Sequence, residues 1–190
     1  MSDARRANVI GLGLIGGSVA LGLRNLGWHV SGDDVDRTTA ATAIERGVVD
    51  ELGVDPTAEI TFVAVPVLAA ADQVKRALAE TSGAVTDVGS VKAAICSACD
   101  DPRFVGGHPM AGSELDGLDG AQDDLFEGAV WVLTPGTDSD DSVFAHVASI
   151  TGSLGAEVVA LSPERHDQLV AVVSHVPHLT AATLMGLASE

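Results

Sequence analysis

The residues best suited to chemistry in this 190-residue chain stand in the run Gly106–Glu114, which reads G-G-H-P-M-A-G-S-E. His108 lies between two glycines and a proline, at the end of a strand expected over 104–107. The proline restrains the backbone, and the glycines leave room for a ligand beside the ring. Because an unperturbed histidine has a pKa near 6.5, His108 is a candidate for proton transfer at neutral pH. The structural alternative is that His108 merely caps the strand end.

A second chemical feature is the glycine pattern at Gly11, Gly13 and Gly16. Apolar residues precede it and a charge-free segment follows as far as Leu23, which predicts a strand, a tight turn and the first turns of a helix. The first glycine permits the turn, the second lets a pyrophosphate approach the backbone, and the third lets the helix pack on the strand. The positive end of the helix would then hold the phosphates. The predicted cofactor contacts in this loop are Gly11, Leu12, Gly13, Leu14, Ile15 and Gly16.

Two acids, Asp33 and Asp34, follow the next expected strand, His29–Gly32. An acid about 20 residues beyond such glycines is where a carboxylate holds the ribose hydroxyls of a dinucleotide. A carboxylate there also repels a 2′-phosphate, which favours NAD over NADP, although Arg37 nearby keeps NADP open. The alternative is that both acids belong to an ordinary solvated loop.

The composition narrows the classes of protein. Hydrophobic residues make up 46% of the chain and aromatic residues 3%, which predicts a globule with an aliphatic core, as in helices laid on a parallel sheet. The net charge of −17 argues against nucleic acid and anionic membranes as partners. The uncharged run Ala7–Leu23 holds five glycines, so it is a poor signal peptide or membrane span. We therefore expect a cytoplasmic protein.

Residues that bind metals in other proteins are present but lack a distinctive spacing. Cys96 and Cys99 form a single C-x-x-C, and a zinc ribbon needs a second pair. We interpret the two cysteines as small apolar residues on a helix. A metal site near the end of the chain is conceivable from residue types alone, but no metal site is predicted among His166, Asp167, His175 and His178.

Strands alternate with helices along most of the chain, which predicts an α/β fold with a doubly wound, mostly parallel sheet of the Rossmann type. Ligands of such sheets lie beyond the carboxyl ends of the strands. We assign residues 1–161 to this dinucleotide-binding domain. Besides the strand before Gly11, strands are expected at 29–32, 60–65, 84–87, 104–107, 130–134 and 157–161. A helix is expected to begin in the glycine turn and to continue over Ser18–Leu26, with Gly27 ending it. Further helices are expected at 38–46, 67–80 and 142–154, and another after Lys92 that runs to about Asp100.

The pattern changes at Ser162. An N-cap serine followed by Pro163 and Glu164 predicts the start of a helix. An apolar stripe then continues at helical spacing to the end of the chain. Pro177 should kink this helix by freeing the carbonyl of Val173. We expect residues 162–190 to form the first helix of an all-helical dimerisation domain.

Further motifs connect these features to a known family. They are D-V-G-S-V-K at 87–92, W-V-L-T-P at 131–135, His166-Asp167, and S-H-V-P-H at 174–178. Together with the glycine loop and the histidine run, they stand in the order found in prephenate/arogenate dehydrogenases. The chain resembles that family over residues 7 to about 185, and the match of so many motifs at once is highly specific.

The resemblance implies an NAD-linked oxidative decarboxylation in tyrosine biosynthesis, from prephenate to 4-hydroxyphenylpyruvate or from arogenate to tyrosine. His108 would accept the proton of the substrate hydroxyl, Ser90 would orient that histidine, and His175 would complete the catalytic set. The rim of the pocket would be shaped by Ser113 and Glu114. The implied substrate contacts are Ser90, Lys92, His108, Ser113, His175 and His178. Further implied cofactor contacts are Val65, Pro66 and Asp87.

Structural alternatives remain open for these residues. Ser90 could be a helix N-cap, Lys92 a surface charge, and His166-Asp167 a charge pair early in a helix. The two histidines of the S-H-V-P-H motif could simply pack a helix.

The resemblance also implies a homodimer and an arginine in the helical domain that grips a substrate carboxylate. No arginine of this chain stands in a matching motif. Two rival functions are another oxidoreductase resembling β-hydroxyacid dehydrogenases, and a non-catalytic NAD-binding fragment.

Overall fold

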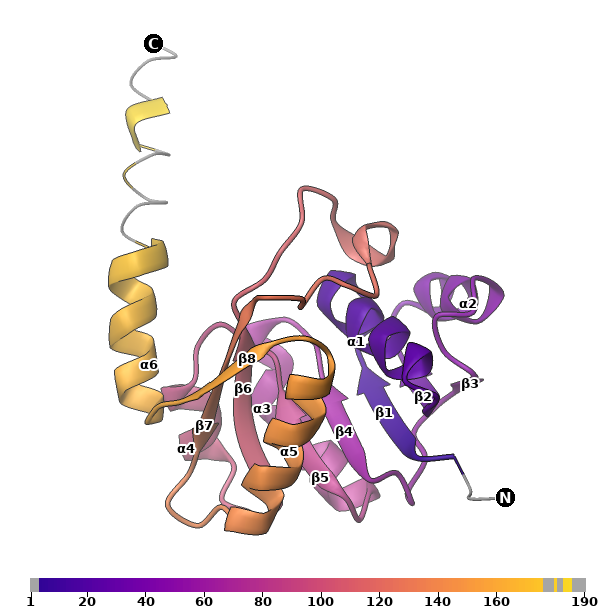
Figure 1. The fold of residues 1–190 in the computed structure, drawn as a ribbon, viewed down its shortest axis with the longest axis horizontal. Helices are drawn as coiled ribbons and strands as arrows, with labels where there is room; N and C mark the ends of the chain where they lie inside the picture. The colour runs from indigo at the N-terminus through magenta and orange to yellow at the C-terminus, as the bar shows by residue number, and fades with distance from the viewer. Residues whose placement is uncertain (1–3, 176–179, 181–182, 186–190) are drawn as a thin grey trace.

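The computed structural model, described for residues 4–175, 180 and 183–185, is built on an eight-stranded sheet with helices on both faces (Figure 1). The strand order is β3-β2-β1-β4-β5-β6-β7-β8. The strands are β1 Arg6–Ile10, β2 His29–Asp33, β3 Glu51–Leu52, β4 Ile60–Val63, β5 Ala84–Asp87, β6 Phe104–Pro109, β7 Val130–Pro135 and β8 Glu157–Ala160. The helices are α1 Leu14–Asn25, α2 Arg37–Glu45, α3 Val67–Glu80, α4 Ala93–Ala98, α5 Asp141–Ser153 and α6 Pro163–Val170. A 3-10 turn covers Gly117–Gly120 and a π-helical turn Ala171–His175.

The strand pairing confirms the predicted doubly wound, mostly parallel sheet. Every neighbouring pair is parallel except β6 and β7, which run antiparallel with His108 opposite Val132. The sequence did not predict β3, because its two residues are exposed and too few to show an alternating pattern. All four residues of β4 are buried, as expected for a central strand covered on both faces.

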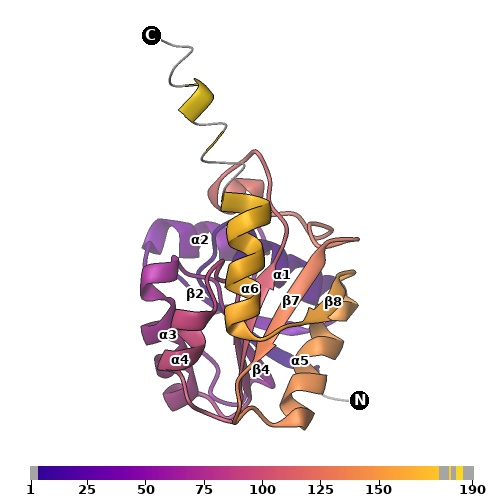
Figure 2. The same ribbon diagram turned by 90° about the vertical axis from the view of Figure 1, so that its left-hand side faces the viewer.

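Two separate hydrophobic clusters cover the faces of the sheet. The larger cluster lies under α1 and α5, and in it Trp131 packs against Phe126 with ring centroids 4.9 Å apart. The smaller cluster lies under α3 and α4. Figure 2 shows these two pairs of helices on opposite sides of the strands. The aliphatic composition thus yields a core of mainly Val, Ile, Leu and Ala, with few rings.

Several predicted helix ends are confirmed, and one is wrong. Gly27, with φ of +82°, follows the end of α1, and the Ser162 side chain caps α6 by accepting a hydrogen bond from Arg165 N. The helix predicted to reach about Asp100 ends at Ala98, so Cys99 forms its C-cap rather than its interior. Burial raises the pKa of the Cys96 and Cys99 thiols, as expected for packing residues.

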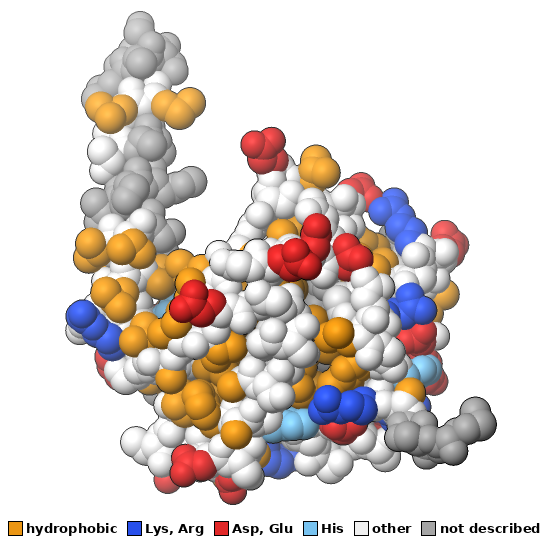
Figure 3. Space-filling model, viewed as in Figure 1, with side chains coloured by type: hydrophobic (Ala, Val, Ile, Leu, Met, Phe, Trp, Pro, Cys, Tyr) orange, Lys and Arg blue, Asp and Glu red, His pale blue; other side chains and the backbone are white. Residues whose placement is uncertain are grey.

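The helix α6 contacts α4 and β7 and then extends away from the sheet (Figures 1 and 2). Its α-helical hydrogen bonding changes to a π-helical turn over Ala171–His175; the predicted kink at Pro177 lies outside the described residues. Val172 and Val173 are exposed there, and Figure 3 shows hydrophobic side chains along this segment. Within the described part of the chain, no helix is both long and apolar enough to cross a membrane.

Candidate functional site

A cavity of about 900 Å³ opens at the carboxyl ends of β1, β2 and β4. The glycine loop, the end of β2 and the start of α3 form its walls. The residues that line it are Ile10, Gly11, Gly13, Leu14, Ile15, Asp33, Asp34, Val35, Arg37, Ala64, Val65, Pro66, Ala69, Gln73 and Arg76. Doubly wound sheets bind their ligands at this position, beyond the carboxyl ends of the strands.

The three glycines of the loop differ in what surrounds them. A Cβ on Gly11 would lie 2.3 Å from the carbonyl oxygen of Ala64, and Gly11 also has a φ of +92°. A Cβ on Gly16 would lie 1.8 Å from Gly11 O. Around Gly13, by contrast, the described residues leave open space within 4 Å. The loop therefore fits a pyrophosphate, which would lie against Gly13 and the first N–H groups of α1.

The two acids after β2 have separate roles. Asp34 accepts hydrogen bonds from Leu12 N at 2.7 Å and from Asp36 N at 2.8 Å, so its carboxylate braces the glycine loop. The Asp33 carboxylate faces the guanidinium of Arg76 at 3.1 Å. Both acids line the cavity, but the Asp34 carboxylate is engaged by two backbone N–H groups, which makes Asp33 the better placed acid for a ribose.

The residues predicted to contact the cofactor differ in whether they line the cavity. Leu14, Ile15, Val65 and Pro66 line the cavity. The Leu12 side chain is fully buried in the larger hydrophobic cluster, because the turn points it into the core. Leu12 as a whole is 0% exposed and is not among the residues that line the cavity, and its predicted cofactor contact stays a prediction.

Asp87 and Lys92 form a buried ion pair beside the cavity edge of the sheet. Both side chains are 0% exposed. The Lys92 ammonium contacts the Asp87 carboxylate and donates to Gly107 O at 2.7 Å. Asp87 also accepts hydrogen bonds from Gly89 N at 2.8 Å and Gly107 N at 3.2 Å. The pair thus fastens β5 to β6 immediately before His108.

This burial corrects two expectations. Lys92 is not a surface charge, and a side chain without exposed surface cannot meet the substrate as predicted. Asp87 is equally inaccessible to a cofactor, because it is 0% exposed. Its carboxylate contacts the Lys92 ammonium and accepts hydrogen bonds from two backbone N–H groups. Both residues hold the backbone at Gly107, next to His108, in place and do not contact ligands themselves.

Hydrogen bonds connect three side chains in series, those of His108, His166 and Asp167. Its Nδ1 lies 2.8 Å from Nε2 of His166, and Nδ1 of His166 lies 2.8 Å from the Asp167 carboxylate. His166 is 1% exposed, whereas His108 is half-buried. The rings of the two histidines meet edge to face, with centroids 5.0 Å apart.

Asp167 ties this chain to α4. Its carboxylate accepts hydrogen bonds from Lys92 N at 2.8 Å and Ala93 N at 3.0 Å, the first N–H groups of that helix. Burial alone would raise the pKa of Asp167, but these N–H groups and the His166 ring hold it below its usual value. Ser90 is therefore not the N-cap of α4, an alternative that the sequence had left open.

The structure brings His108 together with a residue that the sequence assigned to a charge pair. The sequence also places His166-Asp167 among the family motifs and makes a metal site there conceivable, but it predicts no contact between His166 and His108. A signal did exist: His166 shares a helical face with Leu169 and Val170, three and four residues on, so it points inward. Its partner across 58 residues could not be read from that spacing.

The other predicted substrate residues in the described part of the chain lie in three different segments of the fold. Ser90 is half-buried in the segment between β5 and α4. Ser113 lies in the loop after β6, where its hydroxyl accepts a hydrogen bond from Leu115 N at 3.2 Å, and Glu114 beside it is exposed. His175 ends the π-helical turn, and His178 lies outside the described residues.

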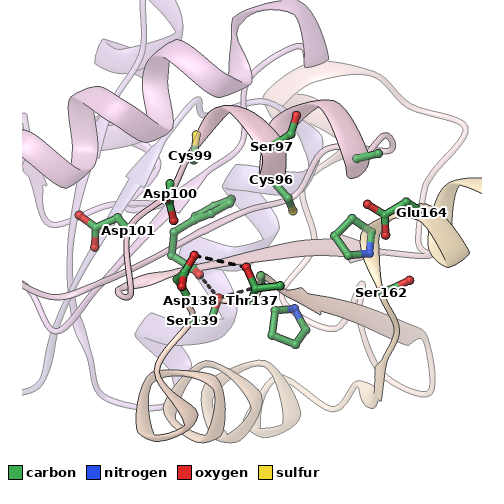
Figure 4. Close-up of a pocket in the computed structure, with 15 residues that line it drawn as sticks. Cys96, Ser97, Cys99, Asp100, Asp101, Thr137, Asp138, Ser139, Ser162 and Glu164 are labelled. Carbon is green, nitrogen blue, oxygen red and sulfur yellow. Dashed lines mark hydrogen bonds between the residues drawn. The ribbon is translucent and has the colours of Figure 1, made fainter.

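A second cavity, of about 480 Å³, lies at the opposite end of β6, between α4, the turn after β7 and the start of α6 (Figure 4). Four acidic side chains line it, which are Asp100, Asp101, Asp138 and Glu164. The hydrogen bond to Asp138 and the charge of that residue raise the pKa of Asp100. Such a pocket repels anions.

The glycine loop, the cavity and the acid beside it define a Rossmann-type nucleotide-binding domain with a histidine at the same edge of the sheet. Comparison with known families narrows this class. The family described as "Prephenate dehydrogenase, nucleotide-binding domain" matches residues 19–160, and "Prephenate dehydrogenase, dimerization domain" matches residues 162–190. The chain belongs to the prephenate dehydrogenase family.

Individual relatives agree with this assignment. A prephenate dehydrogenase of Bacillus subtilis is 36% identical over 92% of this chain, which spans about half (51%) of that relative. A cyclohexadienyl dehydrogenase of Zymomonas mobilis is 31% identical over 100% of this chain and 69% of its own length.

Solved structures show the same likeness. The prephenate dehydrogenase from A. aeolicus, in complex with hydroxyphenyl propionate and NAD+, has a TM-score of 0.90 and 31% identity over 97% of this chain and 69% of its own. The arogenate dehydrogenase of Synechocystis has a TM-score of 0.86 and 37% identity over 97% and 70%. A 3-hydroxyacyl-CoA dehydrogenase from Archaeoglobus fulgidus, at 19% identity and a TM-score of 0.66, shares the fold alone.

Proposed function

We propose that this chain carries out the NAD-dependent oxidative decarboxylation of prephenate to 4-hydroxyphenylpyruvate, or of arogenate to tyrosine. The observation that carries the proposal is His108, which lies near the end of β6 at the same edge of the sheet as the glycine-lined cavity. The names of the relatives support the reaction: they are prephenate, arogenate and cyclohexadienyl dehydrogenases.

The residues present suit this chemistry. When bound, NAD would accept the hydride from the ring carbon that bears the hydroxyl. As that hydride leaves, the electron pair of the O–H bond forms the carbonyl, and the proton passes to His108. Loss of CO2 then makes the ring aromatic, so the protein needs only to position the substrate for this step. Ser90 and His175 remain the proposed partners of His108, and Ser113 and His178 remain proposed substrate contacts.

We further propose that NAD is preferred over NADP, and Asp33 supports this. Its carboxylate would accept hydrogen bonds from the ribose hydroxyls and repel a 2′-phosphate. Two guanidinium groups lie near it, Arg76 at 3.1 Å and Arg37 at 3.9 Å. Asp33→Asn would release both arginines, so we expect the NAD-to-NADP ratio of Kd values to shift toward NADP. Unchanged relative affinities would contradict this role for Asp33.

We also propose a domain boundary and an oligomeric state. A division into residues 1–161 and 162–190 is supported by the two family matches, which meet at the same place. The second match, to a dimerization domain, supports a homodimer formed through this region. Cytoplasmic localisation stays a prediction.

The experiment that tests the function measures NADH formation with prephenate and with arogenate, separately, while NAD binding is titrated. We expect turnover with one of the two, and its loss in His108→Ala. The matched control is His146→Ala, the same substitution at a histidine of helix α5, which should retain activity. NAD binding without turnover would reduce the proposal to a cofactor domain. No NAD binding would overturn it.

A further inference from the structure

A directed chain of hydrogen bonds leads from Asp167 to His108. The Asp167 carboxylate is held ionised by two backbone N–H groups, so it can only accept a hydrogen bond from His166. In the neutral ring of His166, Nδ1 therefore carries the hydrogen and Nε2 carries the lone pair. That lone pair lies 2.8 Å from Nδ1 of His108, which must then be the donor.

The consequence falls on the other nitrogen of His108. A neutral imidazole has one N–H group, and here it is taken by Nδ1. Nε2 thus carries the lone pair, which is the form that a base needs to accept the substrate hydroxyl proton. The opposite tautomer would present an N–H group to that hydroxyl and could not take its proton.

We propose that His166 and Asp167 are positioning residues that fix the tautomer and the orientation of His108. The inference rests on the proposed function, because it assigns His108 the role of base. Asp167 also stabilises the imidazolium that forms when His108 takes the proton, since its negative charge lies one ring away. All three contacts depend on α6, which carries both positioning residues, so the base is prepared only when this helix is docked against α4 and β7.

The test reads the tautomers directly. In a chain with 15N-labelled histidine, NMR correlation of ring nitrogens with ring carbon-bound protons distinguishes the two neutral forms. The measurement is made at pH 8.5, above the ordinary histidine pKa of about 6.5. Signals are assigned by their loss in His108→Gln and His166→Gln. We expect both His108 and His166 to carry their hydrogen on Nδ1.

Asp167→Asn supplies the perturbation. The amide can donate to Nδ1 of His166, which would move the hydrogen of His166 to Nε2 and, in turn, that of His108 to Nε2. We expect this inversion, unchanged NAD affinity, and a fall in kcat of about 10²–10³-fold where the wild type turns over. The matched control Glu164→Gln removes an exposed carboxylate from the same helix and should leave both tautomers unchanged.

The outcomes separate this inference from the proposed function. A wild-type His108 with its hydrogen on Nε2 would overturn the inference, and this measurement needs no variant to fold. An Asp167→Asn chain with inverted tautomers and full kcat would overturn it too. Wild-type tautomers as expected, with neither substrate oxidised, would support the hydrogen-bond chain while the proposed function fails.

Discussion

The cofactor cavity and the His108 region lie at one edge of the sheet, yet they are assembled in different ways. Nine of the fifteen residues that line the cavity come from residues 10–37, which hold the glycine turn, the helix that follows it and the end of the next strand, and the other six come from the segment after β4 and from α3. The His108 chain joins residues 58 positions apart, and Asp167 reaches Lys92 across 75. The first region is therefore set by local backbone geometry, and the second by how elements dock.

This difference makes opposite demands on side chains. In the glycine loop, function depends on missing atoms, because added Cβ atoms would meet the backbone or occupy the phosphate position. Behind His108, function depends on charged and polar groups that are buried and fully partnered. Such networks stabilise only when complete, since a buried charge without its partner is costly.

The largest effect is expected for Lys92→Met. The variant leaves the Asp87 carboxylate buried without its cation, which should lower the free energy of unfolding by about 3–5 kcal/mol. The double variant Asp87→Asn/Lys92→Met removes both charges and should recover part of that loss. Urea denaturation of the two variants checks this. A loss below about 1 kcal/mol in the single variant would mean that the lysine is not needed for charge balance.

A second prediction contrasts two glycines of the cofactor loop. Gly16→Ala would force a Cβ against Gly11 O, so it should cost about 1–3 kcal/mol of stability and also weaken NAD binding. Gly13→Ala meets open space, so its stability should be unchanged, while NAD affinity falls at least about tenfold, or 1.4 kcal/mol. Thermal unfolding and NAD titration of both variants separate the effects. If Gly13→Ala binds NAD normally, the pyrophosphate does not lie at Gly13.

A third prediction uses the lowered pKa of Asp167. Because the pKa is lower in the folded chain than in the unfolded one, ionised Asp167 contributes stability above pH ~4, the unfolded value. This contribution is lost as the pH falls through the folded pKa. Asp167→Asn should therefore unfold more easily than wild type by about 1–2 kcal/mol at pH 7, and the gap should close below pH ~4.

The comparison variant Glu164→Gln, on the same helix, should show little of this pH dependence. Denaturation at a series of pH values provides the measurement. A gap of constant size from pH 7 to pH 3 would show that the charge of Asp167 has no part in stability.

The smallest effect is expected for Asp34→Ala, in the cofactor half. Leu12 N and Asp36 N lose their acceptor, but the side chain is partly exposed and water can replace it. We expect a loss of about 0.5–1 kcal/mol. Denaturation should thus rank the short-range brace at Asp34 below the long-range brace at Asp167. The reverse ranking would contradict the contrast between the two regions.

The sequence by itself determined much of the fold and the cofactor loop. The alternation of strands and helices predicts the doubly wound sheet, and Ser162 and Gly27 mark helix ends that the structure confirms. The spacing of Gly11 and Gly16 predicts the strand–turn–helix unit around the cavity. These features are readable because each acts within a few residues, through backbone angles and steric limits.

Only the tertiary structure decided which polar residues face a ligand and which support the site. Asp33 and Asp34 both line the cavity, yet the Asp33 carboxylate faces Arg76 whereas the Asp34 carboxylate accepts hydrogen bonds from the backbone N–H groups of Leu12 and Asp36. Lys92 is polar in sequence and buried in the fold.

His166 acquires its relation to His108 only when α6 packs on α4 and β7. Sequence spacing fixes the direction of a side chain along its own element. The partner it meets depends on the register and docking of another element many residues away, and that is why the structure was needed here.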